Sequence, residues 1–101
     1  MKCPGKVRVG FADYDIGFGV SMDALGMCDI MRQEITVNNE MTPQQQAQTL
    51  LHEIFHAISH QVHCTKQDEQ EEEFVRRFSS MMAICMRDSP EVFKWIVSVL
   101  K

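Results

Sequence analysis

Three residues within one five-residue stretch, His52, Glu53 and His56, have the types and spacing needed for hydrolysis at a metal ion. The two histidines are four residues apart, so on a helix their Cβ atoms lie about 5–6 Å apart on one face. Two imidazoles placed in this way can share one Zn²⁺, with nitrogen–zinc bonds of about 2.0–2.1 Å. In this HExxH pattern the glutamate is the general base that acts on zinc-bound water. The spacing therefore predicts one Zn²⁺ per chain and a hydrolytic reaction.

A catalytic zinc site needs a third protein ligand and one position left open for water. The pattern HExxHxxGxxH would supply a third histidine, but it requires glycine at 59 and histidine at 62, where the sequence has Ser59 and Val62. His60 and His63 continue the same helix, which carries them about 6 Å or more along its axis away from the metal. We therefore expect these two histidines to line the cleft or to face solvent.

Three consecutive glutamates, Glu71, Glu72 and Glu73, offer another source for the third ligand. They stand at the start of the next predicted helix, and a helix packed against the HExxH helix can deliver one carboxylate to the metal. An acidic first turn also suits the helix dipole, and both roles can hold because only one of the three carboxylates is needed. The residues themselves leave open which of the three binds.

The helix that must carry the motif is marked at its start and along its apolar face. Thr42 can cap it, Pro43 suits its first position and Gln45 completes a capping box, so we expect a helix from there to about Val62. Apolar residues recur at spacings of three and four and predict its core face: Leu50, Leu51, Ile54, Phe55 and Ile58. Because Ile54 and Ile58 lie opposite the histidines, the histidines are predicted to face a cleft.

The remaining elements predict an α+β fold: a small antiparallel or mixed sheet of about three strands, followed by three helices. Alternation over residues 7–11 predicts a first strand that includes Phe11, and residues 26–37 predict a hairpin whose clearer strand is 35–37. A second helix is expected over about 67–87, with these residues inward: Phe74, Val75, Phe78, Met81, Met82 and Cys85.

A third helix is predicted after Ser89 as its cap and Pro90 as its first residue. Its apolar stripe is formed by Val92, Phe93, Ile96 and Leu100. The opposite side, which includes Trp95, is a candidate dimer contact, so we expect a monomer or a weak homodimer.

Length and composition exclude several classes of protein. The 101 residues, 45% hydrophobic and 24% charged, predict a single domain over residues 1–101. A net charge of -4 argues against a nucleic-acid partner, and no apolar run reaches the roughly 18 residues that span a membrane. Without an apolar signal segment or a CxxC pair, the four cysteines are expected to be unpaired thiols in a reducing cytoplasm: Cys3, Cys28, Cys64 and Cys85.

The segment 49–58 closely resembles the motif helix of ImmA/IrrE-type metallopeptidases, in particular the small stand-alone versions of phage and prophage genomes. The resemblance covers residues 24–90, because a strand leads into the HExxH helix and a later helix carries glutamates upstream of an apolar pair. It implies a minimal zincin-like metallopeptidase domain. It also implies the cytoplasm of a bacterial host as its location, and His52 and His56 as zinc ligands with Glu53 as the catalytic residue.

The family's E-x-x-A-N-x-F-A motif implies Glu72 as the third ligand, when its phenylalanine is aligned with Phe78. Val75 and Arg76 then stand at the alanine and asparagine positions, and these departures keep the neighbouring glutamates open as ligands.

The expected partner is a peptide or protein substrate, with no nucleic acid and no membrane. In zincin-like folds an edge strand beside the motif helix holds the substrate by strand addition, and residues 35–38 are the natural candidate. Candidates for stabilising the oxyanion are Tyr14, His60 and His63. The alternative function is a catalytically silent, zinc-stabilised phage or prophage module that binds another protein.

Overall fold

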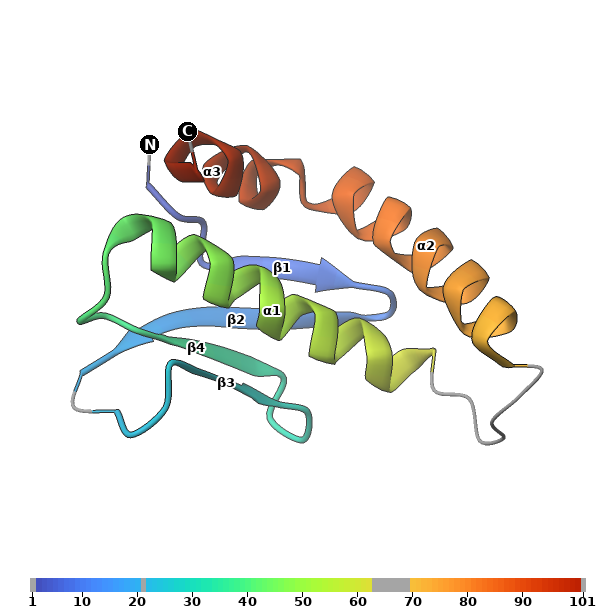
Figure 1. The fold of residues 1–101 in the computed structure, drawn as a ribbon, viewed down its shortest axis with the longest axis horizontal. Coiled ribbons are helices and arrows are strands. Elements are labelled where there is room, and N and C mark those ends of the chain that lie inside the picture. Colours follow the sequence, from blue (N-terminus) through green and yellow to red (C-terminus); the bar gives the residue numbers. More distant parts are fainter. Residues whose placement is uncertain (1, 21, 63–69, 101) are drawn as a thin grey trace.

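In a computed structural model the chain forms a four-stranded mixed sheet and three helices, which confirms the α+β class (Figure 1). The described residues are 2–20, 22–62 and 70–100, without the side chains of 70–72 and 75. The strands are β1 (Lys6–Val9), β2 (Ala12–Gly19), β3 (Gly26–Asp29) and β4 (Glu34–Asn38). The helices are α1 (Pro43–Gln61), α2 (Gln70–Asp88) and α3 (Pro90–Leu100).

The strand order is β1-β2-β4-β3, with β2 and β4 parallel and the other two pairs antiparallel. The hairpin predicted over residues 26–37 is confirmed as β3 and β4. Because β4 lies between β2 and β3, it has no free edge, so the expectation that residues 35–38 hold a substrate strand is wrong. The strand at that edge of the sheet is β3, beside α1 (Figure 1).

The strand absent from the sequence prediction is β2, which makes four strands in place of about three. It follows β1 through a tight turn in which Gly10 has a φ of 62° and Phe11 is 83% exposed. Phe11 therefore does not extend the first strand as predicted, since the chain reverses at Gly10, a residue that adopts positive φ without steric cost. Along β2 the apolar residues Ala12, Tyr14, Ile16 and Phe18 alternate with aspartates and glycines, a strand pattern that the sequence prediction does not include.

The capping box predicted for α1 is present. Thr42 Oγ1 accepts a hydrogen bond from the Gln45 backbone N–H (3.3 Å), and Gln45 Oε1 accepts one from the Thr42 backbone N–H (3.0 Å). The helix ends at Gln61, with Val62 as its C-cap, as predicted to within a residue.

The core lies between the sheet and α1, α2 and α3. Leu50, Ile54 and Ile58 of α1 are fully buried there, as predicted. They belong to one cluster with the two valines of β1 and with the isoleucine and valine of β4. Phe55, also predicted for the core, is 40% exposed. It lies 100° round the helix from Ile54, where α2 and not the sheet covers it, and it contacts Phe78.

The C-terminal helix packs differently from the prediction. Val92 and Ile96 are buried as expected, but Trp95 is only 6% exposed and meets Phe18 edge-to-face, with ring centroids 6.4 Å apart. The expectation of Trp95 on an exposed dimer surface is therefore wrong, because this side of α3 covers the end of β2. Ser89, predicted as a helix cap, uses its hydroxyl to accept a hydrogen bond from the Arg8 backbone N–H (2.7 Å).

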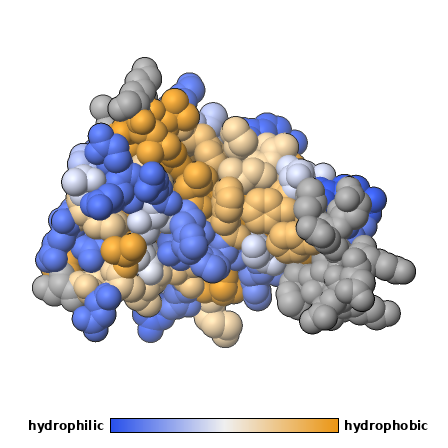
Figure 2. Space-filling view, viewed as in Figure 1, coloured by the Kyte–Doolittle hydropathy of each residue, from blue (hydrophilic) through white to orange (hydrophobic). Residues whose placement is uncertain are grey.

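The surface over α1, α2 and α3 carries a band of hydrophobic residues, which crosses the face shown in Figure 2. The inward positions of α2 pack against the core as predicted. Cys85 is fully buried, and these residues are partly buried: Phe74, Phe78, Met81 and Met82.

Cys3, Cys28 and Cys85 are free thiols, and Cys64 lies outside the described residues. None of the described helices combines the length and the apolar character required to cross a membrane.

Candidate active site

The imidazoles of His52 and His56 converge on one point. Their Nε2 atoms are 3.0 Å apart, their ring centroids 4.7 Å apart, and their planes meet at 81°. Two nitrogens bound to one tetrahedral Zn²⁺ at about 2.0–2.1 Å would be about 3.3–3.4 Å apart. The histidine pair therefore fits a shared zinc ion after a shift of a few tenths of an ångström.

Glu53 is the buried charged residue of the described chain, with 7% of its surface exposed. Within residues 2–20, 22–62 and 70–100 no hydrogen bond or ion pair reaches its carboxylate, although the side chain lines the cleft beside the histidines. Its carboxylate oxygens are not among the fully buried side-chain atoms that lack a partner, so they are reached from the cleft. Glu53 is therefore placed to accept a proton from a molecule in the cleft.

Gly26 of β3 makes the position of Glu53 sterically possible. A Cβ atom at residue 26 would lie 2.6 Å from Thr49 Cγ2 and 3.1 Å from Glu53 Oε2. The missing side chain lets α1 approach the edge strand closely enough to seat the carboxylate against the strand backbone. Sequence reasoning read this glycine only as the start of a hairpin, because the contact with α1 depends on the strand order.

The histidines and Glu53 open into a cleft of about 720 Å³, as the helix phase predicted. Its opposite wall comes from β3 and the turn after it, and includes Cys28 and Ile30. His60 lines the same cleft, whereas Tyr14 is only 2% exposed and belongs to the core, which removes it as a candidate for the oxyanion. The other candidate, His63, lies outside the described residues.

Cys28 is a neutral group in the cleft wall. Burial, and then the negative charges of Glu53 and Asp29, raise the pKa of its thiol to about 11. The thiol therefore stays protonated near neutral pH and adds no charge beside the carboxylate. The sequence prediction did not place Cys28 here, because its side-chain direction depends on the register of β3 against β4, with Cys28 opposite the buried Ile35.

The helix that follows the motif lies beside α1, on the other side of the histidines from β3. Phe55 and Phe78 meet edge-to-face with centroids 5.1 Å apart. Around the axis of α1, Phe55 and Glu53 lie on opposite sides of the histidine pair, at about 80° from its middle. The predicted packing of the glutamate-bearing helix against the motif helix is thus present.

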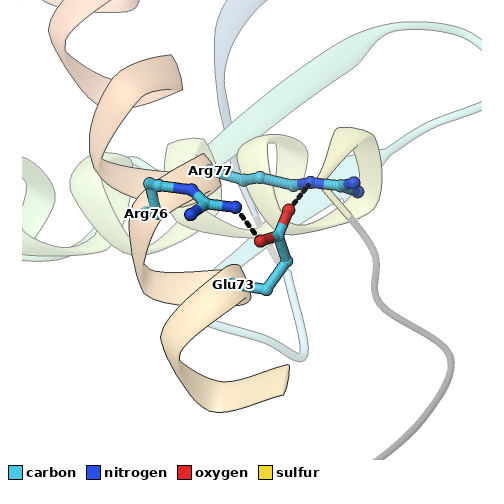
Figure 3. Close-up of polar contacts among 3 residues, drawn as sticks. All are labelled: Glu73, Arg76 and Arg77. Atoms are coloured by element: carbon cyan, nitrogen blue, oxygen red, sulfur yellow. Dashed lines mark hydrogen bonds and ion pairs between the residues drawn. The ribbon is translucent and has the colours of Figure 1, made fainter. Parts of the chain in front are cut away.

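Of the three glutamates at the start of α2, Glu73 is the one whose side chain is described. Its carboxylate pairs with Arg76 and with Arg77, whose Nε lies 2.8 Å from Oε1 (Figure 3). The side chains of Glu71 and Glu72 lie outside the description, so Glu72 as the third ligand stays a prediction. Among the described residues, no group of three or more His, Cys, Asp or Glu side chains could hold a metal ion.

Comparison with known proteins identifies one family. The family model described as the IrrE N-terminal-like domain, Peptidase_M78, matches residues 8–91, which run from β1 to the start of α3 and include the whole cleft. Neither a search of curated proteins nor a search of solved structures gave a significant match.

Proposed function

The chain belongs to the IrrE N-terminal-like family, Peptidase_M78, and on this basis we propose that it hydrolyses peptide bonds with one Zn²⁺ held by His52 and His56. The observation that carries the proposal is the convergent histidine pair beside the largely buried Glu53, whose carboxylate has no hydrogen-bond partner among the described residues. When bound, zinc supplies a Lewis acid that polarises the substrate carbonyl and lowers the pKa of water.

Glu53 is the general base of the proposed reaction. It takes a proton from water as the water oxygen bonds to the carbonyl carbon. It then passes that proton to the nitrogen as the carbon–nitrogen bond breaks, so one water is consumed for each bond cleaved. Seating the carboxylate against Gly26 keeps it in place for both transfers without a competing hydrogen bond from the described residues.

We assign the third ligand to Glu72, with Glu71 as the alternative. Glu73 is less suited, because its carboxylate is already engaged by two guanidinium groups of its own helix. The contact between Phe55 and Phe78 supports this assignment, since it holds α2 beside the histidines. A carboxylate from α2 would complete a set of His, His and Glu with one position open to water.

The experiment is a zinc titration of the purified protein at micromolar concentration, with His52→Ala and His60→Ala as a matched pair. Both histidines line the cleft, but only His52 shares the convergence point with His56. We expect one zinc per chain in the wild type and in His60→Ala, and loss of zinc in His52→Ala. A wild type that binds no zinc would disprove the proposal.

The alternative function, a zinc-stabilised binding module, has no use for a general base. The Glu53 carboxylate, which faces the cleft without a hydrogen-bond partner among the described residues, therefore favours catalysis. Glu53→Gln separates the two, because it removes the base and keeps both histidines. The bacterial cytoplasm, the phage or prophage origin and the absence of a nucleic-acid partner rest on the sequence and the resemblance, and stay predictions.

A further inference from the structure

A second cavity, of about 640 Å³, lies beside β2 and the N-terminal segment, whereas the cleft of His52 and Glu53 lies beside β3. It opens where the N-terminal segment, the start of α1 and α3 come together at one end of the sheet (Figure 1). We call it the Trp95 cavity, after the indole in its wall. None of the described residues that line it also lines the cleft. Its volume is within the range of pockets that hold small molecules.

The indole of Trp95 brings a hydrogen-bond donor to this cavity. The residue is only 6% exposed, and no described residue accepts a hydrogen bond from its Nε1–H. This nitrogen is not among the fully buried side-chain atoms that lack a partner, so it is reached from the cavity that the ring lines. Buried tryptophan N–H groups usually find a hydrogen-bond partner. The donor of Trp95 is therefore available to an acceptor on a bound molecule.

Phe18 adds apolar surface to the wall of the cavity. It lies opposite Val37 in the register of β2 and β4, and Val37 is fully buried under the helices. Phe18 consequently faces the helix side of the sheet, yet it is 38% exposed. Its ring meets Trp95 edge-to-face and lines the cavity together with Ile16. Apolar surface that the helices leave uncovered favours a ligand with an apolar body.

Two walls of the cavity are held in place by hydrogen bonds of the chain itself. The backbone N–H of Ile16 donates to Gly5 O (2.8 Å), which ties the N-terminal segment to β2. On the other side, Gln46 Nε2 donates to Asn39 O (3.3 Å) and to Met41 O (3.2 Å), which fixes the connection between β4 and α1. A ligand therefore finds walls that are already ordered, which lowers the cost of binding.

The charge of the lining is positive. Among the described residues that line the cavity, Lys2 is the only one with a charged side chain. Cys3, also in the wall, stays neutral near physiological pH because burial raises the pKa of its thiol to about 11. The described lining thus offers one cation and one indole donor and includes no carboxylate, so it is complementary to an anion.

We propose that the Trp95 cavity binds a small carboxylate with an apolar body. The apolar body would lie against Phe18 and Ile16, and the carboxylate would accept a hydrogen bond from the indole N–H of Trp95 and be attracted by Lys2. The C-terminal end of a peptide with an apolar last residue carries the same chemistry as a free acid. Binding needs neither zinc nor peptide cleavage, because the cavity and the cleft share no described lining residue.

Trp95 is the single tryptophan of the chain, so its fluorescence reports on the cavity directly. The protein would be titrated, with and without added zinc, with phenylpropionate as a free acid and with acetyl-alanyl-phenylalanine as a peptide end. We expect a saturable change in fluorescence with a Kd of about 4 mM or tighter, equal in both zinc conditions. Binding of either acid supports the proposal, and the tighter of the two identifies the source of the carboxylate.

Two further compounds separate the charge from the apolar body. Phenylpropionamide keeps the ring and lacks the charge, and it should bind at least about tenfold more weakly than phenylpropionate. Propionate keeps the charge and lacks the ring, and it should also bind at least about tenfold more weakly.

Gly5→Leu and Gly17→Leu form a matched pair that locates the site, because an added Cβ at either glycine meets nothing within 4 Å. Gly5 lies opposite Ile16 where the register of β1 and β2 continues, so a leucine there would fill the cavity. Gly17 follows Ile16 in β2, so a leucine there would point to the other face of the sheet. We expect Gly5→Leu to weaken binding at least about tenfold, and Gly17→Leu to bind as the wild type does.

Lys2→Met tests the charge at an exposed position, where folding is not at risk. It should weaken phenylpropionate by about two- to fivefold and leave phenylpropionamide unchanged. The proposal would be overturned by no saturable change with either acid, by equal binding of the amide, or by binding that survives Gly5→Leu. Binding that requires zinc would place the acid in the cleft and would also overturn it. None of these measurements involves cleavage, so their outcome is separate from that of the proposed peptidase function.

Discussion

Gly26→Ala should disturb both the packing and the chemistry of the site, because the new methyl group has no room. It would lie 2.6 Å from Thr49 Cγ2, and a β-branched side chain on a helix is too stiff to move aside freely. Overpacking of this kind costs about 1–3 kcal/mol, against about 0.4–1 kcal/mol gained from the less flexible unfolded chain. The expected net loss is about 1–2 kcal/mol, or a fall in Tm of about 5–15 °C for a domain of this size.

The assay is thermal and urea unfolding of Gly26→Ala beside two companion variants. Gly17→Ala, where an added Cβ meets nothing within 4 Å, should leave stability unchanged or raise it slightly. Thr49→Ser removes the clashing methyl group, so the double variant should regain about 1 kcal/mol. The double variant still has the Cβ at residue 26, 3.1 Å from Glu53 Oε2. We therefore expect peptide cleavage to be slow in Gly26→Ala and to remain slow in the double variant, although its stability returns. If Gly26→Ala were as stable and active as Gly17→Ala, the close approach of α1 to β3 would be wrong.

Three further outcomes follow from the site and its surroundings. Glu73→Gln should bind zinc as the wild type does, because the Glu73 carboxylate forms ion pairs within α2. A zinc titration measures this, and loss of zinc would assign the third ligand to Glu73. In zinc-free protein, alkylation of Cys28 by iodoacetamide should accelerate as pH rises from about 9 toward 11, since burial and nearby charge raise its pKa to about 11. Glu53→Gln removes one of those negative charges and should move the alkylation profile of Cys28 to lower pH. An unmoved profile would show that Glu53 does not lie close enough to Cys28 to affect its pKa. A double-mutant cycle on Phe55→Ala and Phe78→Ala, followed by urea unfolding, should give a coupling energy of about 0.5–1.5 kcal/mol, and a value near zero would contradict their edge-to-face contact.

The parts of the site that depend on one helix could be predicted from the sequence. The capping box at Thr42 and Gln45 sets where α1 begins, and the spacing of His52 and His56 sets their convergence, because both depend on the geometry of a single helix. The burial of Ile54 opposite the histidines follows from the same periodicity.

The parts that depend on strand order could not be predicted. Ala12, Tyr14, Ile16 and Phe18 alternate with aspartates and glycines along β2, but this alternation does not show that the strand pairs with β4 and leaves β3 at the edge. Gly26 and Cys28 therefore went unnoticed, although they form one wall of the cleft. Trp95 was misplaced for a related reason, since its partner Phe18 belongs to the unrecognised strand.

The central claim is that Glu53 acts as the base of a zinc-dependent peptidase. The most direct measurement compares peptide cleavage by the wild type and by Glu53→Gln, each loaded with one zinc per chain. The account predicts cleavage by the wild type, and a rate at least about 10²-fold lower for the variant at equal zinc content. Equal rates in the two proteins, or no cleavage by the zinc-loaded wild type, would contradict it.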